Sequence, residues 1–313
     1  MEKVVLAQKT DESVAAYLSG HCELVFCKEG DSEDLRRVLS DAVAVVLGTW
    51  VKFTKEFIDA APKLKVISRT GAGVDNVDFD YARQNGILVL NTPRANRISV
   101  AEHTIAMICA LSKHFNFLDK KVREGEFGTR RLYLPTDIDG KTLGMVGCGA
   151  IAAEVAKKCT LAFNMKVIGY DPHITAAPEN IGLCSTLEEI FRQSDYVSLH
   201  LPLTPKTDGL VGEDLLNLMK PTAFIINTAR GGIIDENALY TALKSRRIAG
   251  AGLDVFADEP LPKGSKLAEL DNLLLTPHTA ALTKECALRV AMCAAQGVVD
   301  YLQGKTPEFI FGK

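Results

Sequence analysis

Short runs of apolar, largely β-branched residues recur along the chain between stretches with helical spacing. One series lies in the first 90 residues and a second starts near residue 142. The runs are residues 4–7, 24–27, 43–47, 66–68, 88–90, 142–147, 167–170, 196–199, 223–227, 249–255 and 273–276. They lack polar alternation, which is typical of parallel strands covered by helices on both faces. The pattern predicts an α/β protein with two doubly wound parallel sheets.

Two longer apolar segments predict helices that join the sheets. Residues 99–111 begin with a serine suited to helix capping and continue on helical spacing. Residues 284–302 form a second long helix that returns the chain to the first domain. We therefore expect one domain from residues 1–98 and 283–313, another from residues 99–282, and a cleft between them.

The amino-acid composition limits the kinds of molecule that the protein is expected to bind. The 313 residues carry 36 basic and 39 acidic side chains, a net charge of −3, which offers no electrostatic basis for binding nucleic acid or a membrane surface. The sequence predicts no signal peptide and no run of ~18 apolar residues, so we expect a cytoplasmic protein. The eight cysteines form no C-x-x-C pair, which favours buried reduced thiols. We also expect no appended regulatory domain after the last helix.

A glycine loop follows the first strand of the second series. Residues 142–152 read TLGMVGCGAIA, a strand followed by G-x-G-x-x-A and a predicted helix near Ile151. Gly147 permits the tight turn, Gly149 allows a pyrophosphate to approach the backbone, and Ala152 lets helix and strand pack closely. Such a loop also arises for steric reasons alone, so the motif by itself is weak.

An acidic residue at the end of the next strand strengthens the prediction of a dinucleotide site. Asp171 lies 24 positions after Gly147, near the ~20 expected of a carboxylate that binds the adenosine ribose. An anion there disfavours a 2′-phosphate and favours NAD over NADP. The alternative is that Asp171 serves as a helix cap or turn residue before Pro172.

Five further segments carry a family resemblance. They are residues 227–232 (NTARGG), 252–260 (GLDVFADEP), 276–280 (TPHTA), 69–78 (RTGAGVDNVD) and 91–93 (NTP). With the glycine loop they resemble the D-isomer-specific 2-hydroxyacid dehydrogenase family, most closely its D-3-phosphoglycerate dehydrogenase branch. The resemblance implies a Rossmann NAD-binding domain, a flavodoxin-like substrate domain, and hydride transfer between NAD and C2 of a small 2-hydroxy or 2-oxo acid.

Three residues in these segments match the catalytic needs of that reaction. Arg230 supplies a planar cation for the substrate carboxylate. His278 supplies an imidazole, the side-chain type best suited to give and take protons in this reaction. Glu259 would orient the imidazole and stabilise its protonated form. The alternatives are a structural salt bridge for Arg230, a polar loop residue for His278 and a turn boundary for Glu259.

The resemblance also implies cofactor contacts, mostly through backbone groups, and no metal. Asp254 would hold the nicotinamide carboxamide. The remaining implied residues are Thr104, Gly147, Gly149, Ala150, Ile151, Asp171, Leu201, Thr228, Ala229 and Ala281.

The substrate residues are expected in the first domain. Backbone N–H groups of the turn at residues 71–73, through Ala72 and Gly73, can bind a carboxylate. Arg69, Arg94 and Arg97 could receive a second anion such as a phosphate, although solvated surface charge is the alternative for the latter two.

The loop of residues 48–54 departs from the phosphoglycerate branch. Gly48 and Thr49 stand where that branch usually has Arg-Ser, which weakens the phosphoglycerate assignment. Trp50 would either wall the pocket or simply pack on its neighbours.

Other readings remain open. The substrate could be another acid, such as hydroxypyruvate, glyoxylate, sulfolactate or a branched 2-oxo acid, and a remote alternative is a non-catalytic NAD-sensing protein. We expect a homodimer formed through residues 99–111 and the arm that continues to Tyr133, because this stretch is apolar and relatives pair there.

Overall fold

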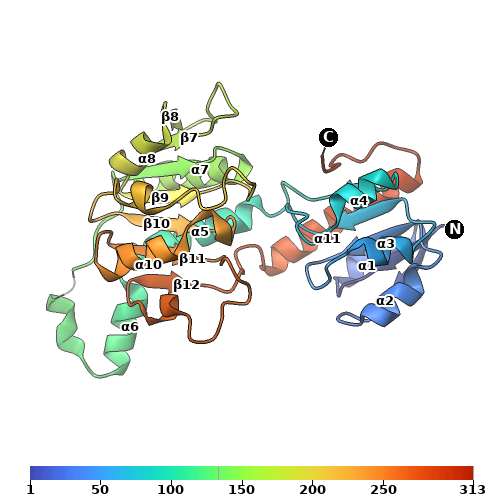
Figure 1. The fold of residues 1–313 in the computed structure, drawn as a ribbon, viewed down its shortest axis with the longest axis horizontal. Helices are drawn as coiled ribbons and strands as arrows, with labels where there is room; N and C mark the ends of the chain where they lie inside the picture. The colour runs from blue at the N-terminus through green and yellow to red at the C-terminus, as the bar shows by residue number, and fades with distance from the viewer. Residues whose placement is uncertain (133, 313) are drawn as a thin grey trace. The chain divides into compact units, whose positions relative to one another are not determined.

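A computed structural model describes residues 1–132 and 134–312 of the chain. The chain divides into two compact units, unit 1 (Met1–Arg97 and Ala281–Lys313) and unit 2 (Ile98–Ala280). Each unit contains one parallel β-sheet with helices on both faces (Figure 1). The predicted α/β fold with two doubly wound sheets is confirmed.

Unit 1 contains a five-stranded sheet in the order β2-β1-β3-β4-β5. Its strands are β1 (Lys3–Leu6), β2 (Glu23–Phe26), β3 (Ala44–Leu47), β4 (Val66–Arg69) and β5 (Leu88–Leu90). Its helices are α1 (Glu12–Ser19), α2 (Ser32–Leu39), α3 (Lys55–Asp59), α4 (Phe79–Gln84) and α11 (Lys284–Leu302). The strand order changes direction between β1 and β3, which is where ligands bind in sheets of this order.

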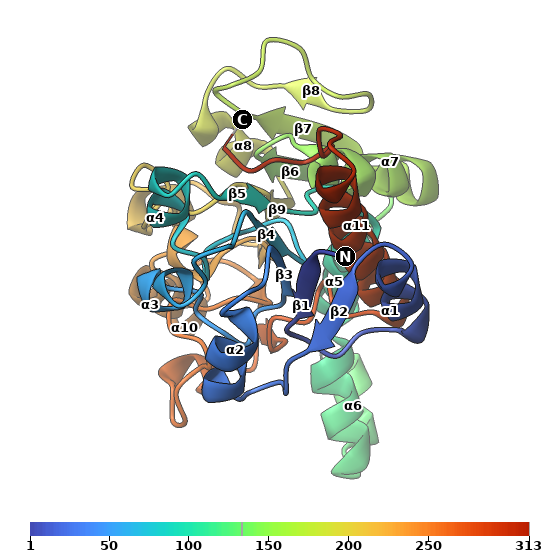
Figure 2. The same cartoon turned by 90° about the vertical axis from the view of Figure 1, so that its right-hand side faces the viewer.

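Helix α11 belongs to unit 1 although it lies nearly 200 residues after β5 in the sequence. The Thr283 hydroxyl caps the helix by accepting a hydrogen bond from the Cys286 N–H. A stripe of Ala291, Ala295 and Val298 packs with α1 against one face of the sheet. Helices α2, α3 and α4 cover the other face (Figure 2). The two faces therefore hold separate hydrophobic cores.

Unit 2 contains a seven-stranded sheet in the order β12-β11-β10-β9-β6-β7-β8. Its strands are β6 (Thr142–Val146), β7 (Lys166–Tyr170), β8 (Gly182–Leu183), β9 (Tyr196–Leu199), β10 (Phe224–Asn227), β11 (Gly250–Leu253) and β12 (Leu273–Leu275). Its α-helices are α5, which begins at the last residue of unit 1 (Arg97–Ser112), α6 (Phe115–Arg123), α7 (Ala150–Phe163), α8 (Leu187–Gln193), α9 (Glu213–Leu216) and α10 (Glu236–Lys244). Three short 3-10 helices are η1 (Phe127–Arg131), η2 (Gly231–Ile233) and η3 (Lys266–Glu269).

Helices also cover both faces of this second sheet. Apolar side chains of α5 and α7 fill the core on one face. Those of α8, α9 and α10 fill the core on the other. All seven strands pair in parallel, so the carboxyl ends of β10, β11 and β12 lie side by side at one edge.

The structure differs from the sequence pattern in a few elements. Strand β8 and helix α6 were not predicted, because β8 is only two residues long and α6 has no buried residue to give it an apolar period. Helix α5 begins at Arg97, so the buried Ser99 lies inside the helix and is not its cap. The other predicted strands match the observed ones to within two residues.

Two negative findings apply to the described part of the chain, residues 1–132 and 134–312. None of its helices is both long and apolar enough to cross a bilayer, and no group of acidic, His and Cys side chains there is suited to hold a metal ion. All eight cysteines are free thiols. Burial raises the pKa of Cys148 to about 11 and that of Cys159 to about 12, so both stay protonated at neutral pH.

Candidate active site

The glycine loop between β6 and α7 has the geometry that a bound dinucleotide requires. Gly147 has φ +88°, and a Cβ on it would lie 2.5 Å from the His200 carbonyl oxygen, so only glycine fits this turn. By contrast, a Cβ on Gly149 would meet no atom within 4 Å. Gly149 and Ala150 are exposed, and no side chain caps α7. The free helix N-terminus and the open space beside it fit a pyrophosphate.

Asp171 is held at the end of β7 by two main-chain hydrogen bonds. Its Oδ2 accepts from the Cys148 N–H at 3.0 Å, and its Oδ1 accepts from the His173 N–H at 3.0 Å. The first bond ties the carboxylate to the glycine loop, as expected of a group that binds a ribose. The bond from the His173 N–H also closes the turn after β7, so Asp171 has the turn-forming role that was the alternative to ribose binding. The N–H groups at the start of α7 and the acceptor oxygens of Asp171 therefore fit NAD.

The other predicted cofactor residues occupy varied environments. Ile151 is in the first turn of α7, Leu201 follows β9, and Ala281 is the first residue of the second segment of unit 1. Thr104 and Thr228 are buried and share a 3.0 Å hydrogen bond between their hydroxyls, and Ala229 donates its N–H to Asn227 Oδ1.

His200 lies beside the glycine loop at the carboxyl end of β9. Its N–H donates to the Val146 carbonyl at 2.7 Å, and its Nε2 lies 2.8 Å from Ser198 Oγ. Burial lowers the pKa of His200 to about 4, because a charged ring loses hydration there. The imidazole is therefore neutral near pH 7.

This shift predicts a pH dependence of stability. Between pH 6.5 and 4 the unfolded chain protonates this histidine and the folded chain does not, so stability falls as the pH falls. The loss should be about 1–3 kcal/mol. Urea unfolding at several pH values should show a shallower decline for His200→Asn than for the unsubstituted chain. Equal slopes for the two proteins would contradict the lowered pKa of His200. The pKa of His114 is also lowered, but this histidine is present in both proteins and contributes in the same direction to both slopes.

Arg230, Glu259 and His278 come from three adjacent strand ends of unit 2. Arg230 follows β10, Glu259 follows β11 and His278 follows β12. These three strands are neighbours in one parallel sheet, so the loops that carry the residues emerge at the same edge. The sheet thus brings together side chains from positions spread over 49 residues of sequence, from 230 to 278.

Glu259 and His278 form a direct hydrogen-bonded pair. Glu259 Oε2 lies 2.7 Å from His278 Nδ1, and Glu259 Oε1 accepts from the Phe256 N–H at 3.1 Å. The imidazole is half exposed, with a side-chain exposure of 50%. Because Nδ1 faces the carboxylate, Nε2 is the ring atom left to exchange a proton with a substrate.

Close packing fixes the loop of Arg230 against the loop of Glu259. A Cβ on Gly231 would lie 1.9 Å from the Phe256 carbonyl carbon and oxygen. Arg230 itself is partly buried and donates from Nη1 to the Ala229 carbonyl oxygen at 2.7 Å. This close approach holds the guanidinium loop beside the carboxylate loop, and only a glycine permits it.

Asp254 lies beneath this site. Its side chain has no exposed surface, and its oxygens accept hydrogen bonds from the N–H groups of Thr279 and Ala280 at 2.8 and 2.9 Å. The contact with the nicotinamide carboxamide that we expected of Asp254 stays a prediction. What the structure shows is that Asp254 supports the loop that contains His278.

The predicted substrate residues lie in unit 1. Arg69 is the last residue of β4, and its Nη1 donates a hydrogen bond to the Thr70 carbonyl oxygen at 3.0 Å. The guanidinium lies close to Gly71, because a Cβ on Gly71 would be 1.4 Å from Nη1 of Arg69. Ala72 and Gly73 are partly exposed on the turn that follows. Arg94 and Arg97 are both exposed, and the Arg94 guanidinium lies 5.8 Å from the centre of the Phe309 ring.

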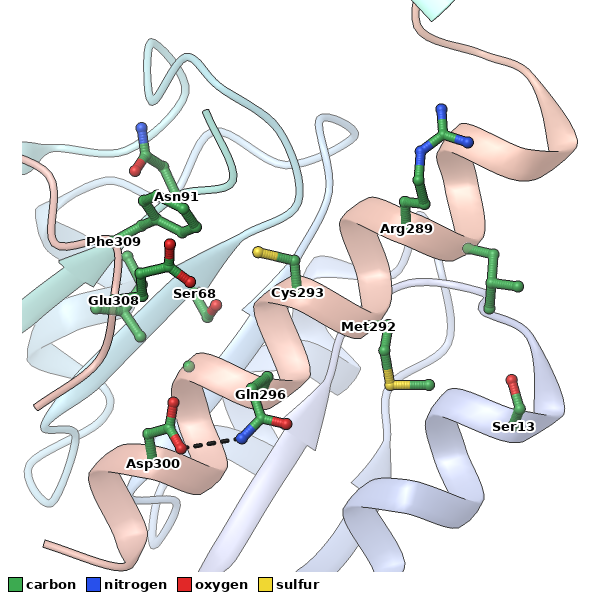
Figure 3. Close-up of a pocket in the computed structure, with 13 residues that line it drawn as sticks. Ser13, Ser68, Asn91, Arg289, Met292, Cys293, Gln296, Asp300, Glu308 and Phe309 are labelled. Atoms are coloured by element: carbon green, nitrogen blue, oxygen red, sulfur yellow. Dashed lines mark hydrogen bonds between the residues drawn. The ribbon is translucent and has the colours of Figure 1, made fainter. Parts of the chain in front are cut away.

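A separate cavity of about 560 Å³ lies within unit 1 along one face of α11 (Figure 3). Arg289, Cys293 and Gln296 of the helix line it together with Asn91 and Glu308, and the Cys293 thiol points toward the side of Glu308. None of its lining residues belongs to the predicted catalytic, cofactor or substrate sets. The volume of a cavity is therefore a poor guide to the chemistry of this chain.

The sequence reasoning missed several residues that build the site. His103 and Thr276 hydrogen-bond within it, and Gly231 makes the close contact described above. Thr276 and Gly231 lie within the recognised segments, but their spacing alone reveals no partner. His103 follows Glu102 on a largely apolar helix, where a satisfied polar residue is the ordinary interpretation.

The fold and the loop together define a dinucleotide-binding α/β protein with an Arg, Glu and His set beside its sheet edge. Residues 105–280 match the profile described as "D-isomer specific 2-hydroxyacid dehydrogenase, NAD binding domain". The chain therefore belongs to the D-isomer-specific 2-hydroxyacid dehydrogenase family, and this region is its NAD-binding domain.

Curated and solved relatives agree with that family. The chain is 38% identical over 311 residues to a D-3-phosphoglycerate dehydrogenase of Methanocaldococcus jannaschii, covering 98% of this chain and 59% of the relative. A crystal structure of a glyoxylate reductase from Paecilomyes thermophila is 29% identical with a TM-score of 0.89, covering 99% of this chain and 98% of that one. A D-lactate dehydrogenase from Aquifex aeolicus, solved with NAD and lactic acid, is 31% identical with a TM-score of 0.83, covering 97% and 96%. The chain spans 55–59% of the length of the first three curated relatives.

Proposed function

We propose that this protein is an NAD-dependent dehydrogenase of small D-2-hydroxy acids. The observation that carries the proposal is the 2.7 Å pair of Glu259 and His278 beside the Arg230 loop, at one sheet edge of an NAD-binding domain. A non-catalytic NAD-sensing protein would not need a carboxylate aligned on the imidazole Nδ1. The free thiols of all eight cysteines suit the reducing cytoplasm, where we place it.

The roles of the residues follow from their chemistry. Arg230 binds the substrate carboxylate and polarises the neighbouring carbonyl. His278 Nε2 gives a proton to the carbonyl oxygen during reduction and takes it from the hydroxyl during oxidation. Glu259 holds the ring so that Nε2 faces the substrate. When bound, NAD supplies or accepts the hydride, and Gly149, Ala150, Asp171 and the other predicted contacts hold it.

Two acids are candidates for the substrate. The curated relatives are named D-3-phosphoglycerate dehydrogenases, and we propose that Arg69 receives a phosphate while the N–H groups of Ala72 and Gly73 bind a carboxylate. These roles favour D-3-phosphoglycerate.

The carboxyl edge of the unit 1 sheet favours a second candidate, an acid with an uncharged tail. A Cβ on Gly48 would lie 2.4 Å from Gln8 Oε1, so the Gln8 amide occupies the space that a longer residue at position 48 would need. Gln8 Oε1 also accepts from the Thr70 hydroxyl at 2.9 Å, and Trp50 donates its indole N–H to the Ala7 carbonyl. Gln8, Trp50 and Thr70 lie after β1, β3 and β4, and the strand order reverses between the first two of these strands. All three side chains are neutral, in contrast to Arg69 at the end of β4.

The acid is identified by following NADH consumption with a panel of 2-oxo acids. If Arg69 binds a phosphate, Arg69→Ala should lower kcat/KM for 3-phosphohydroxypyruvate about 10- to 100-fold more than for hydroxypyruvate, because a charged hydrogen bond is lost. Arg94→Ala is the matched control, since its exposed guanidinium lies over Phe309. Equal losses of kcat/KM with both acids would contradict a phosphate-binding role for Arg69. If the protein does not turn over the phosphorylated acid at all, the substrate is the second candidate, an acid with an uncharged tail.

We also propose that the protein is a homodimer, formed through the arm of α6 and η1. Phe115, Val122, Phe127, Leu132 and Leu134 are 58–78% exposed, and α6 extends away from the sheet of unit 2 (Figure 2). The expected surface also included α5, whose Ala101, Met107, Ile108 and Leu111 are buried in the core of unit 2, whereas Ile98 of the same helix is 37% exposed. Tyr133 lies outside the described residues.

Sedimentation tests the dimer. The unsubstituted protein should sediment as a dimer at micromolar concentration, and a variant combining Leu132→Ser and Leu134→Ser should sediment as a monomer, because burial of these leucines would be lost. Leu161→Ser is the control, since Leu161 is 73% exposed on α7 and outside the arm. A monomeric unsubstituted protein would exclude the proposal.

A further inference from the structure

Helix α5 delivers a second histidine to the sheet edge that contains His278. The helix approaches β11 closely, because a Cβ on Gly252 would lie 3.3 Å from side-chain atoms of Met107 and Leu111. Near the amino end of the same helix, His103 Nε2 lies 3.0 Å from Thr276 Oγ1 and 3.6 Å from Asp254 Oδ1. Thr276 and Asp254 directly follow β12 and β11.

The hydrogen bonds in this group have a defined direction. Thr276 Oγ1 lies 2.6 Å from Asp254 Oδ1, and a carboxylate can only accept, so the single hydroxyl proton points at Asp254. The Thr276 oxygen must then accept from His103. This requires that Nε2 of His103 carries a proton, so that the ring acts as the donor in its hydrogen bond to Thr276.

Asp254 in turn holds the loop that contains His278. The Asp254 carboxylate accepts hydrogen bonds from the N–H groups of Thr279 and Ala280. The Asp254 main-chain carbonyl oxygen accepts another from the His278 N–H at 2.7 Å. His278 has φ +52°, in the left-handed region, which a non-glycine residue adopts only where its surroundings hold it. The position of the His278 ring therefore depends on Asp254.

We propose that His103 is a positioning residue for His278, acting through Thr276 and Asp254. Among the described residues, its ring nitrogen Nε2 meets Thr276 and Asp254, which precede the loop of His278, and not Glu259. Its imidazole keeps the Thr276 hydroxyl aimed at Asp254, and Asp254 then keeps the backbone of residues 276–280 in the conformation that places His278. This role rests on the proposed function of His278 as the group that exchanges a proton with the substrate.

A purely structural role would have different consequences. The His103 side chain is 22% exposed and belongs to neither core cluster of unit 2. Replacing it should therefore leave the folding of the unit largely intact. A structural role would change stability alone, whereas a positioning role changes the turnover of bound substrate.

Steady-state kinetics of two variants separate these roles. We expect His103→Leu to lower kcat about tenfold, the effect of one hydrogen bond, with little change in KM for the acid. His103→Gln should recover most of kcat, because its side-chain amide can still donate to Thr276. An unchanged kcat in the leucine variant, or equal losses in both variants, would overturn the proposal.

A double-mutant cycle tests the route through Thr276. Thr276→Val removes the hydroxyl at nearly constant shape, and Thr276→Ser is the control that retains it. If His103 acts through this hydroxyl, the double variant with His103→Leu should have the same kcat as Thr276→Val alone. Losses that multiply would show that His103 acts by another route.

A readout without substrate separates this inference from the proposed function. The chain has six histidines, so their ring nitrogens can be followed by NMR after 15N-histidine labelling, with His278→Ala assigning the His278 signals. We expect these signals to shift in His103→Leu and to stay near their original position in His103→Gln. Signals unmoved by the leucine substitution would overturn the positioning role. If no 2-oxo acid is reduced by the unsubstituted protein, the proposed function fails, while the ring signals still decide whether His103 positions His278.

Discussion

His278→Ala should abolish turnover while NADH still binds. The substitution removes the group that we propose exchanges a proton with the substrate, and such groups contribute roughly 10²- to 10⁴-fold to the rate. The proposed cofactor contacts at Gly149 and Asp171 come from other loops and remain intact. We therefore expect kcat to fall by about that factor, with the affinity for NADH, measured by fluorescence titration, within about twofold of the original value.

Two further variants control this experiment. His21→Ala changes an exposed histidine on unit 1 that contacts only Tyr17 among aromatic residues, and its kcat should be normal. Glu259→Gln keeps the shape of the side chain but not its charge, so it should lose less activity than His278→Ala. Normal turnover by His278→Ala would remove this histidine from the mechanism.

Gly231→Ala should have the largest effect on stability among glycine substitutions at the site. Its Cβ would lie 1.9 Å from the Phe256 carbonyl group and 2.5 Å from the Ala257 nitrogen. These are backbone atoms beside a buried strand end, so they cannot rotate away as a flexible side chain would. We expect a loss of at least about 3 kcal/mol in the free energy of unfolding, measured with urea. Activity should fall as well, because the loops of Arg230 and Glu259 must separate.

The adjacent glycine provides a matched control. A Cβ on Gly232 would lie 3.2 Å from Asp208 Oδ1 and 3.3 Å from Leu203 side-chain carbons, all of them movable atoms. Gly232→Ala should therefore cost less than about 1 kcal/mol. Equal stabilities for the two alanine variants would mean that the contact between Gly231 and Phe256 does not constrain the site.

The sequence pattern did not predict β8 and α6, because neither element contributes a buried apolar residue. Strand β8 is too short to show a periodicity, and α6 projects from its unit without a buried face. The sequence pattern of α5 predicted an interface, and the structure shows that one face of this helix, with Ala101, Met107, Ile108 and Leu111, packs in the core of unit 2. Hydrophobic pattern reports that a side chain is to be buried but not against which partner.

The sequence by itself determined the α/β class and the glycine loop, because strand patterns and turn residues are local properties. Its family resemblance and side-chain chemistry led to the prediction of Arg230, Glu259 and His278. Only the tertiary structure decided that Glu259 Oε2 meets His278 Nδ1 at 2.7 Å and that Gly231 abuts Phe256. It also decided that His103 reaches Thr276 across 173 positions of sequence. These contacts depend on the parallel pairing of β10, β11 and β12 and on the packing of α5 against β11, and no residue encodes either one alone.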